Sequence, residues 1–143
     1  MQKKQREAIF MTHELIIEKL CQNGFRSYLV GGAVRDLFNN HNPKDYDIAS
    51  SADSNVINQI FQDSNHKINS VGKSFLVTII DGIEVSQFRK DVYFGYSDKN
   101  CEIQPAESIE EDLSRRDFTI NAMAFCPYTG DLIDPFNGVT EPA

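Results

Sequence analysis

Apolar residues recur along this chain with two different spacings, which predicts a mixture of helices and strands. Helical spacing predicts helices over residues 3–22, 33–38 and 51–62. Another helix begins at Ser108, because Ser108 and Glu111 form the S-x-x-E pattern of a capping box. Short apolar runs predict strands at 27–30, 45–49 and 75–88. Residues 89–104 have no clean period and are predicted to form a loop.

The clearest hairpin pattern lies within residues 75–88. The runs FLVTII and IEVSQF flank Asp81-Gly82, a pair that is favoured in the two-residue type I′ turn. This turn places Ile79 opposite Glu84. Glu84 then shares a strand face with Phe75, Val77, Ser86 and Phe88, and that face is mostly apolar. A carboxylate there is costly unless it is paired or bound to a cation. Glu84 is therefore either a metal ligand or a strand-end acid that reaches water just past the turn.

Two aspartates mark the strand predicted at 45–49. Asp45 and Asp47 are two residues apart, so in a strand both carboxylates point to one face, with Cα atoms roughly 6.6 Å apart. Magnesium prefers oxygen ligands and is commonly held by one or two carboxylates together with substrate phosphates. The pattern indicates a metal site, although an Asp-x-Asp pair is also common at a solvated strand end.

A glycine pair precedes these aspartates. Gly31 and Gly32 lie between the predicted strand 27–30 and a helix, where glycine lets the backbone approach a ligand and free N–H groups attract phosphate. Arg35 follows in the first turns of that helix, where a positive charge interacts unfavourably with the helix dipole. A phosphate or a carboxylate that faces Arg35 would compensate for this cost. The alternatives are a simple tight turn and a structural pair between Arg35 and Asp36. Together, the glycine pair and the aspartates favour a nucleotide site.

The helix that begins at Ser108 carries a second group of polar residues. Asp117 and Asn121 are one helical turn apart and can present their polar groups together. Phe118, Ala122 and Phe125 form an apolar stripe that we expect to pack on the sheet. The alternative for Asp117 is that it caps a second helical piece. After this stripe, CPYTGDLIDP is predicted to be a turn between short strands.

Composition limits the class of protein. The 143 residues suit one domain, and 41% hydrophobic with 24% charged residues is typical of a soluble globular protein. No apolar run has the ~20 residues of a membrane helix, and the N-terminus lacks the apolar core of a signal peptide. Three widely spaced cysteines, Cys21, Cys101 and Cys126, fit neither a disulfide framework nor a zinc site, and they indicate a reducing cytoplasm. The net charge of −7 argues against tight binding of a nucleic acid by this chain alone.

Two long motifs carry a family resemblance. GGAVRD followed by PKDYDIA, within residues 28–49, resembles the start of the head domain of class II tRNA nucleotidyltransferases. These are the CCA-adding enzymes and the bacterial-type poly(A) polymerases. EEDLSRRDFTINAMAF, residues 110–125, is similar to the other head-domain signature of that family. The two motifs bracket most of the chain, and they occur in the expected order.

The resemblance implies a fold and a set of roles. The fold is an α+β nucleotidyltransferase head of polymerase-beta type, with a small mixed sheet and helices mainly on one face. Asp45 and Asp47 would be catalytic ligands of Mg²⁺, in a site that holds two ions, and Glu84 would be a nearby catalytic carboxylate. The nucleotide, ATP or CTP, would be bound by Gly31, Gly32, Arg35, Arg116, Asp117 and Asn121.

The implied reaction adds nucleotides from an NTP to the 3′ end of a tRNA or another RNA, with release of pyrophosphate. Two alternatives remain open: a head that binds nucleotide without turnover, and a small nucleotidyltransferase that acts on a protein or another acceptor. Residues 1–143 are expected to be a single head domain, without the neck, body and tail that follow in the family. RNA is therefore expected to bind weakly to this chain alone. The choice between CCA and poly(A) addition stays open.

Overall fold

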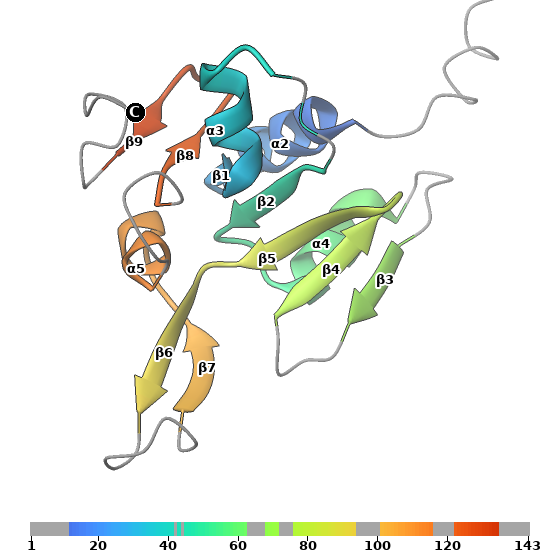
Figure 1. Ribbon diagram of the computed structural model, residues 1–143. Helices are drawn as coiled ribbons and strands as arrows, with labels where there is room; N and C mark the ends of the chain where they lie inside the picture. The colour runs from blue at the N-terminus through green and yellow to red at the C-terminus, as the bar shows by residue number, and fades with distance from the viewer. Residues whose placement is uncertain are drawn as a thin grey trace, which may run out of the picture.

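A mixed sheet forms the centre of the computed structural model, which describes residues 12–41, 43, 45–62, 68–71, 76–93, 101–115 and 122–134. Within these residues the main sheet has seven strands in the order β3-β4-β5-β2-β1-β8-β9 (Figure 1). Its strands are β1 Ser27–Val30, β2 Asp47–Ser50, β3 Ile68–Val71, β4 Val77–Ile80, β5 Ile83–Gln87, β8 Ala124–Phe125 and β9 Leu132–Ile133. A separate two-stranded ribbon pairs β6 Arg89–Tyr93 with β7 Cys101–Pro105. The described helices are α2 His13–Gln22, α3 Gly32–Phe38, α4 Ser54–Phe61 and α5 Ile109–Ser114.

The main sheet consists of two antiparallel parts joined by one parallel pair. In one part β1 pairs antiparallel with β2 and with β8. In the other, β4 pairs antiparallel with β3 and with β5. Strands β2 and β5 are parallel neighbours and join the two parts. Among the described strands this is the one parallel pairing, and it makes the sheet mixed, as the family resemblance implies.

Three helices pack on one face of the sheet. Leu29, Ile48 and Val85 are paired side by side on that face and are fully buried. Helix α4 reaches the same face, since the Thr78 hydroxyl, paired with Val85, donates a hydrogen bond to Ser54 Oγ at 3.3 Å. Helix α2 packs on β1 and β2. The prediction of an α+β fold with helices mainly on one face is confirmed.

Helix α3 is held to this face by aromatic packing. The Phe38 ring meets the Phe125 ring edge to face, with centroids 6.2 Å apart, and Phe125 is paired with Leu29. Helix α5 lies apart from these helices, beside the start of the ribbon (Figure 1). On the opposite face, Asp47 on β2 and Glu84 on β5 are exposed, whereas the paired residues Ala49 and Ser86 further along the same strands are buried.

Local chemistry explains the hairpin of β4 and β5. Asp81 and Gly82 have φ values of 48° and 85°, the left-handed pair that a type I′ turn requires. The pairing of Ile79 with Glu84 follows from that turn and confirms the predicted register. The hairpin therefore fixes which face Glu84 occupies.

Apart from the strand predicted at residues 45–49, three predicted elements differ from the observed ones. Residues 89–104, predicted as a loop, include the paired strands β6 and β7, so that prediction was wrong for both ends of the stretch. Helix α2 begins at His13, where Thr12 Oγ1 accepts the Leu15 N–H at 3.3 Å; residues 3–11 of the predicted helix lie outside the described residues. Phe125 belongs to β8 rather than to a helical stripe, because its backbone pairs with β1.

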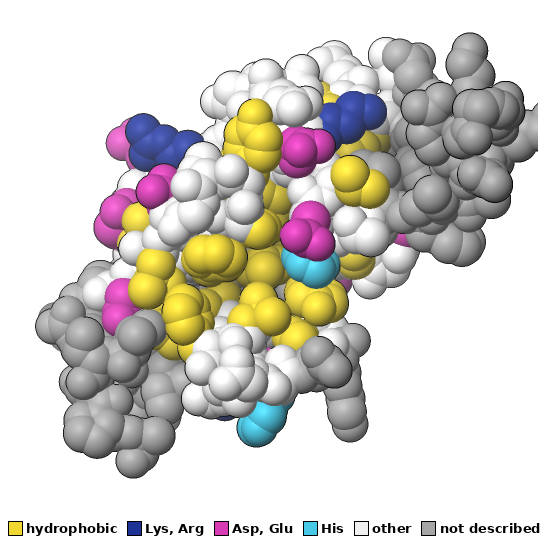
Figure 2. Space-filling view, turned by 90° about the horizontal axis from the view of Figure 1, so that it is seen from above, with side chains coloured by type: hydrophobic (Ala, Val, Ile, Leu, Met, Phe, Trp, Pro, Cys, Tyr) yellow, Lys and Arg dark blue, Asp and Glu magenta, His cyan; other side chains and the backbone are white. Residues whose placement is uncertain are grey.

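Apolar side chains also gather on part of the surface. Figure 2 shows hydrophobic side chains grouped on the face that is turned upward in Figure 1. Leu15 on α2, with Leu37 and Phe38 on α3, are large apolar side chains that remain exposed. The exposed surface of α2 and α3 therefore includes several large apolar side chains. In the described part of the chain, no helix has the length and the apolar character needed to cross a lipid bilayer.

Two cysteines are neighbours where α2 passes the end of β8. Cys126 is buried, and the partly buried Cys21 shares a hydrogen bond with it; both are free thiols. Burial, and after it the neighbouring Cys126 thiol, raises the pKa of Cys21 to about 11.

We expect Cys21 to resist alkylation in the folded protein. At pH 8 a thiol with this pKa is almost entirely protonated, and only the thiolate attacks iodoacetamide. Cys21 should react roughly two orders of magnitude more slowly than an unperturbed cysteine. Its rate should rise as the pH approaches 11. Peptide mass spectrometry of partially alkylated protein measures the rate at each cysteine, and urea-unfolded chain is the control. An ordinary rate for Cys21 at pH 8 in the folded protein would contradict its buried environment.

Candidate functional site

Two exposed carboxylates stand side by side at one end of β2 and β5, on the face opposite to the three helices. In the parallel register of β2 and β5, Asp47 pairs with Glu84. Neighbouring strands are only ~4.8 Å apart and paired residues point to the same side, so both carboxylates belong to one small area. Both side chains are exposed. Glu84 therefore reaches water and shares the face of Asp47 at the same time, which keeps both interpretations of Glu84 open.

Asp45 lies just outside this ladder. Strand β2 begins at Asp47, so the prediction of a strand over residues 45–49 was wrong for its first two residues. The reason lies in β1, which ends at Val30 opposite Asp47 and leaves no partner on that strand for Asp45. Asp45 is exposed and precedes Asp47 by two residues. Its carboxylate is close in the chain but is not fixed by strand pairing.

The glycine turn passes next to Asp47. Gly31 follows Val30 at the end of β1 and has a φ of 74°, which favours glycine. A Cβ atom at Gly31 would lie 3.9 Å from Asp47 Oδ2. Gly31 is also the N-cap of α3. The backbone of the turn and the carboxylate of Asp47 are thus in direct proximity, as expected for one site.

Arg35 folds back toward the same turn. Its Nη2 atom lies 3.6 Å from the position that a Cβ atom of Gly32 would occupy. The Arg35 Nε atom is 3.9 Å from Asp36 Oδ1, and both side chains are substantially exposed. An exposed pair at this distance contributes little to stability, so it does not commit the guanidinium to a structural role. Gly31, Gly32, Arg35 and Asp47 therefore form one cluster.

Asp45, Asp47 and Glu84 suit a hard cation whose other ligands are waters and substrate phosphates. Among the described residues, no three histidine, cysteine or acidic side chains come together as a metal-binding group. Asp47 and Glu84 supply oxygen donors from adjacent strands, and Asp45 is nearby in the chain. Magnesium keeps several waters and takes substrate phosphates as ligands, so two carboxylates suffice. The residues present fit Mg²⁺ bound together with a nucleotide better than a closed protein cage.

The second motif is visible only at its start. Helix α5 begins as predicted: Ser108 Oγ accepts the Glu111 N–H at 3.2 Å, and Glu111 Oε1 accepts the Glu107 N–H at 3.0 Å. The candidate nucleotide contacts Arg116, Asp117 and Asn121 lie outside the residues that the structure describes. Their predicted places therefore stay predictions.

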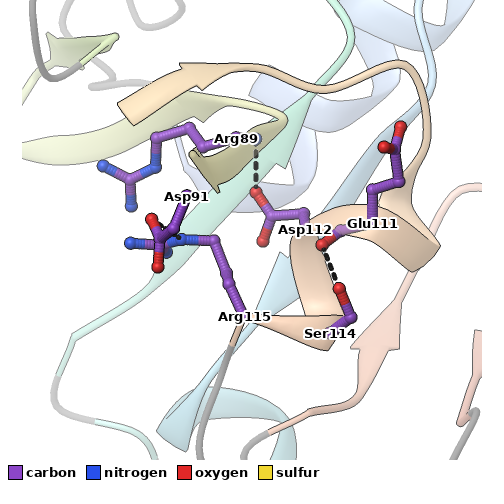
Figure 3. A network of polar contacts seen from close by, with 6 residues as sticks. All are labelled: Arg89, Asp91, Glu111, Asp112, Ser114 and Arg115. Carbon is purple, nitrogen blue, oxygen red and sulfur yellow. Dashed lines mark hydrogen bonds and ion pairs between the residues drawn. The ribbon is translucent and has the colours of Figure 1, made fainter. Parts of the chain in front are cut away.

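The structure reveals a polar network in α5 that the sequence interpretation missed. Asp112 is fully buried, and its Oδ2 accepts the Arg89 N–H at 2.9 Å (Figure 3). The signal was present in the sequence, because Ile109, Asp112 and Leu113 have the i, i+3, i+4 spacing of an inner helix face. A carboxylate on such a face requires a partner inside the protein.

Comparisons with known proteins agree with this geometry. Residues 27–141 match the family described as "Poly A polymerase head domain". Poly(A) polymerase I of Haemophilus influenzae is 36% identical in an alignment 143 positions long. The alignment covers 88% of this chain and 30% of that protein. The CCA-adding enzyme of Leuconostoc citreum is 37% identical over 134 residues, which cover 94% of this chain and 33% of that enzyme.

Solved structures show the same fold. The crystal structure of the Bacillus stearothermophilus CCA-adding enzyme in complex with CTP matches with a TM-score of 0.68 and 37% identity. The match covers 96% of this chain and 31% of that one. A tRNA nucleotidyltransferase complexed with a primer tRNA and an incoming ATP analog matches with a TM-score of 0.68 and 27% identity, over 87% of this chain and 35% of that one. The chain thus spans about a third of the length of these relatives.

The neighbouring carboxylates yield a prediction about stability without metal. We expect Glu84→Gln to leave the free energy of unfolding unchanged or to raise it by up to about 1 kcal/mol, because it removes one of two like charges on adjacent strands. Urea unfolding in a chelator at low ionic strength measures this. The gain should shrink in high salt, which screens exposed charges. A clear loss of stability would instead mean that the Glu84 carboxylate holds the fold together.

Proposed function

The chain belongs to the poly(A) polymerase head-domain family, and on that premise we propose that it is the nucleotide-transferring head of an RNA-extending enzyme. The reaction adds a nucleotide from an NTP to the 3′ end of a tRNA or another RNA and releases pyrophosphate. One observation carries the proposal: the Gly31 turn lies against the exposed Asp47 carboxylate, which is itself paired with Glu84 on the adjacent strand. This arrangement combines a phosphate-accessible backbone with oxygen ligands for a cation.

The residues of this cluster divide the work between phosphate and metal. Asp45 and Asp47 hold Mg²⁺ in this proposal, in a site for two ions, and Glu84 adds a carboxylate beside Asp47. When bound, the metal supplies charge stabilisation for the attacking and leaving oxygens. Gly31 and Gly32 let the backbone approach the triphosphate, because no side chain stands in the way. Arg35 pairs with phosphate charge, since its contact with Asp36 is weak and easily exchanged.

The transfer itself needs no side-chain nucleophile. The RNA 3′-hydroxyl attacks the α-phosphate in line, the new phosphorus–oxygen bond forms, and the bond to pyrophosphate breaks. Arg116, Asp117 and Asn121 contact the nucleotide in this proposal, by their place in the second family motif. The 143 residues form one head domain, and RNA is held weakly by it because its net charge is −7. The free thiols of Cys21 and Cys126 support a place in the reducing cytoplasm.

The same negative charge favours a second candidate, a head that binds Mg·NTP without extending RNA. Calorimetric titration with Mg·ATP tests nucleotide binding, which both candidates require. Extension of a labelled tRNA separates them, since only the first candidate lengthens the RNA. Transfer of a labelled nucleotide to a protein instead of RNA would favour a third candidate, a nucleotidyltransferase that modifies a protein.

Replacing either aspartate should abolish the Mg²⁺-dependent transfer. Metal ions contribute several kcal/mol of transition-state stabilisation, so Asp45→Ala or Asp47→Ala should lower the rate at least about a hundredfold. The circular dichroism spectrum should stay native, because both side chains are exposed. Glu14→Ala, an exposed acid on α2, is the matched control and should retain full activity. Near-complete activity in either aspartate variant would remove that residue from the site.

Base choice should be weak in this chain. Phosphate, metal and ribose are common to every NTP, so the proposed contacts carry no information about the base. Discrimination requires paired donors and acceptors, whose mismatch costs ~1–3 kcal/mol each. We expect the dissociation constants of the Mg²⁺ complexes of CTP, ATP, GTP and UTP to agree within about tenfold in competition titrations. A preference of roughly a hundredfold, or ~2.7 kcal/mol, would show that this chain has base-reading residues of its own.

A further inference from the structure

Tyr46 lies between the two proposed metal ligands, and its ring packs against the protein interior. It is partly buried against the hydrophobic core, whereas Asp45 and Asp47 on either side of it are exposed. The His13 ring of α2 lies flat on the Tyr46 ring, with ring centroids 3.8 Å apart and ring planes inclined by 7°. A helix from much earlier in the chain therefore contacts the short segment that carries both carboxylates.

Helix α2 is a firm base for this contact. Ile16, Ile17 and Leu20 are fully buried, and the helix packs on β1 and β2 (Figure 1). The Thr12 carbonyl accepts the Ile16 N–H at 3.0 Å and closes the first turn of the helix. His13 is the first residue of that helix, so the packing of α2 sets the position of the His13 ring.

The backbone holds the two carboxylates to different degrees. Asp47 is paired with Val30 on β1 and with Glu84 on β5. Asp45 precedes the strand, so strand pairing does not fix it. Successive Cα atoms are only ~3.8 Å apart, so a restraint on Tyr46 also limits the directions available to the Asp45 side chain. The ring contact thus supplies a restraint at a point that the sheet does not reach.

We propose that the stack of His13 on Tyr46 is a positioning contact for Asp45, which it orients toward the metal shared with Asp47. This inference rests on the proposed function, in which the two aspartates bind Mg²⁺. Neither ring is assigned a contact with metal or nucleotide.

The contact acts through the flat surface of the His13 ring and not through charge. Burial lowers the pKa of His13, against the smaller and opposite effect of the neighbouring Glu14 carboxylate. The imidazole is therefore largely uncharged at pH 7.5. A neutral aromatic ring of similar shape should replace it, whereas an aliphatic side chain should not.

Leucine and phenylalanine substitutions test this role with the 143-residue chain and Mg·CTP at pH 7.5. His13→Leu removes the ring and should raise the calorimetric dissociation constant about tenfold, because the freedom of Asp45 must then be lost on binding. His13→Phe keeps a flat ring and should stay within about twofold of the unaltered chain. Both variants remove the imidazole, so the difference between them isolates the stack. Tyr46→Leu and Tyr46→Phe repeat the comparison from the other ring, and they decide it where His13→Leu does not fold.

A double-mutant cycle with Asp45→Ala shows whether the stack acts through that carboxylate. Adding His13→Leu to Asp45→Ala should weaken binding by less than about twofold further, because no carboxylate is left to position. A stack that only stabilises the fold would give additive losses instead. Each titration is made well below the melting temperature of the variant, so the fraction of folded chain does not enter the dissociation constant.

His41→Ala is the matched control. His41 is an exposed histidine four residues before Asp45, so its loss removes an imidazole near the same carboxylate and leaves both rings of the stack in place. Its dissociation constant should equal that of the unaltered chain. Unchanged affinity in His13→Leu, an equal loss in His13→Phe or in His41→Ala, or additive losses in the cycle would each overturn the positioning role. Failure of the unaltered chain to bind Mg·CTP would instead overturn the proposed function, and this inference with it.

Discussion

The parallel pairing of β2 with β5 is the constraint on which the rest of the structure depends. It joins two antiparallel parts into one sheet, and its register sets Asp47 beside Glu84. Two like charges on adjacent strands oppose that pairing unless a cation or solvent compensates for them. The buried row on the other face, with Ile48 against Val85, supplies the opposing apolar stabilisation. The same register thus provides both the core and the acidic surface.

Features that depend on neighbouring residues were predicted well from the sequence. The Asp81-Gly82 turn fixes both the hairpin and its register, because two residues with positive φ permit one close pairing. Strand β1 and the cap at Ser108 also follow from short local patterns. The motif between Gly31 and Asp47 places the turn near the carboxylate, since a short helix separates the two strands.

Features that depend on distant parts of the chain could not be derived in this way. The contact of Asp47 with Glu84 requires the strand order, which apolar spacing does not reveal. The ribbon of β6 and β7 pairs outside the main sheet, so its described side chains are at most partly buried and show no clean alternation. Asp112 was recognisable only as a polar residue at an inner helical position, and its partner on Arg89 came from the fold. The roles of Arg116, Asp117 and Asn121 still rest on the motif that contains them.

The parallel joint also has a consequence for the order in which this chain folds. The hairpin of β4 and β5 closes over two residues, whereas β5 reaches β2 only after α4, β3 and β4 have been traversed. Longer loops close at a greater entropic cost, so we expect the joint to form late. A chain in which the two antiparallel parts have formed, but β2 and β5 have not yet paired, does not bring Asp47 and Glu84 together on one surface. Any ligand of that surface binds the joined state alone, and its concentration in the cell then shifts the folding equilibrium toward completion.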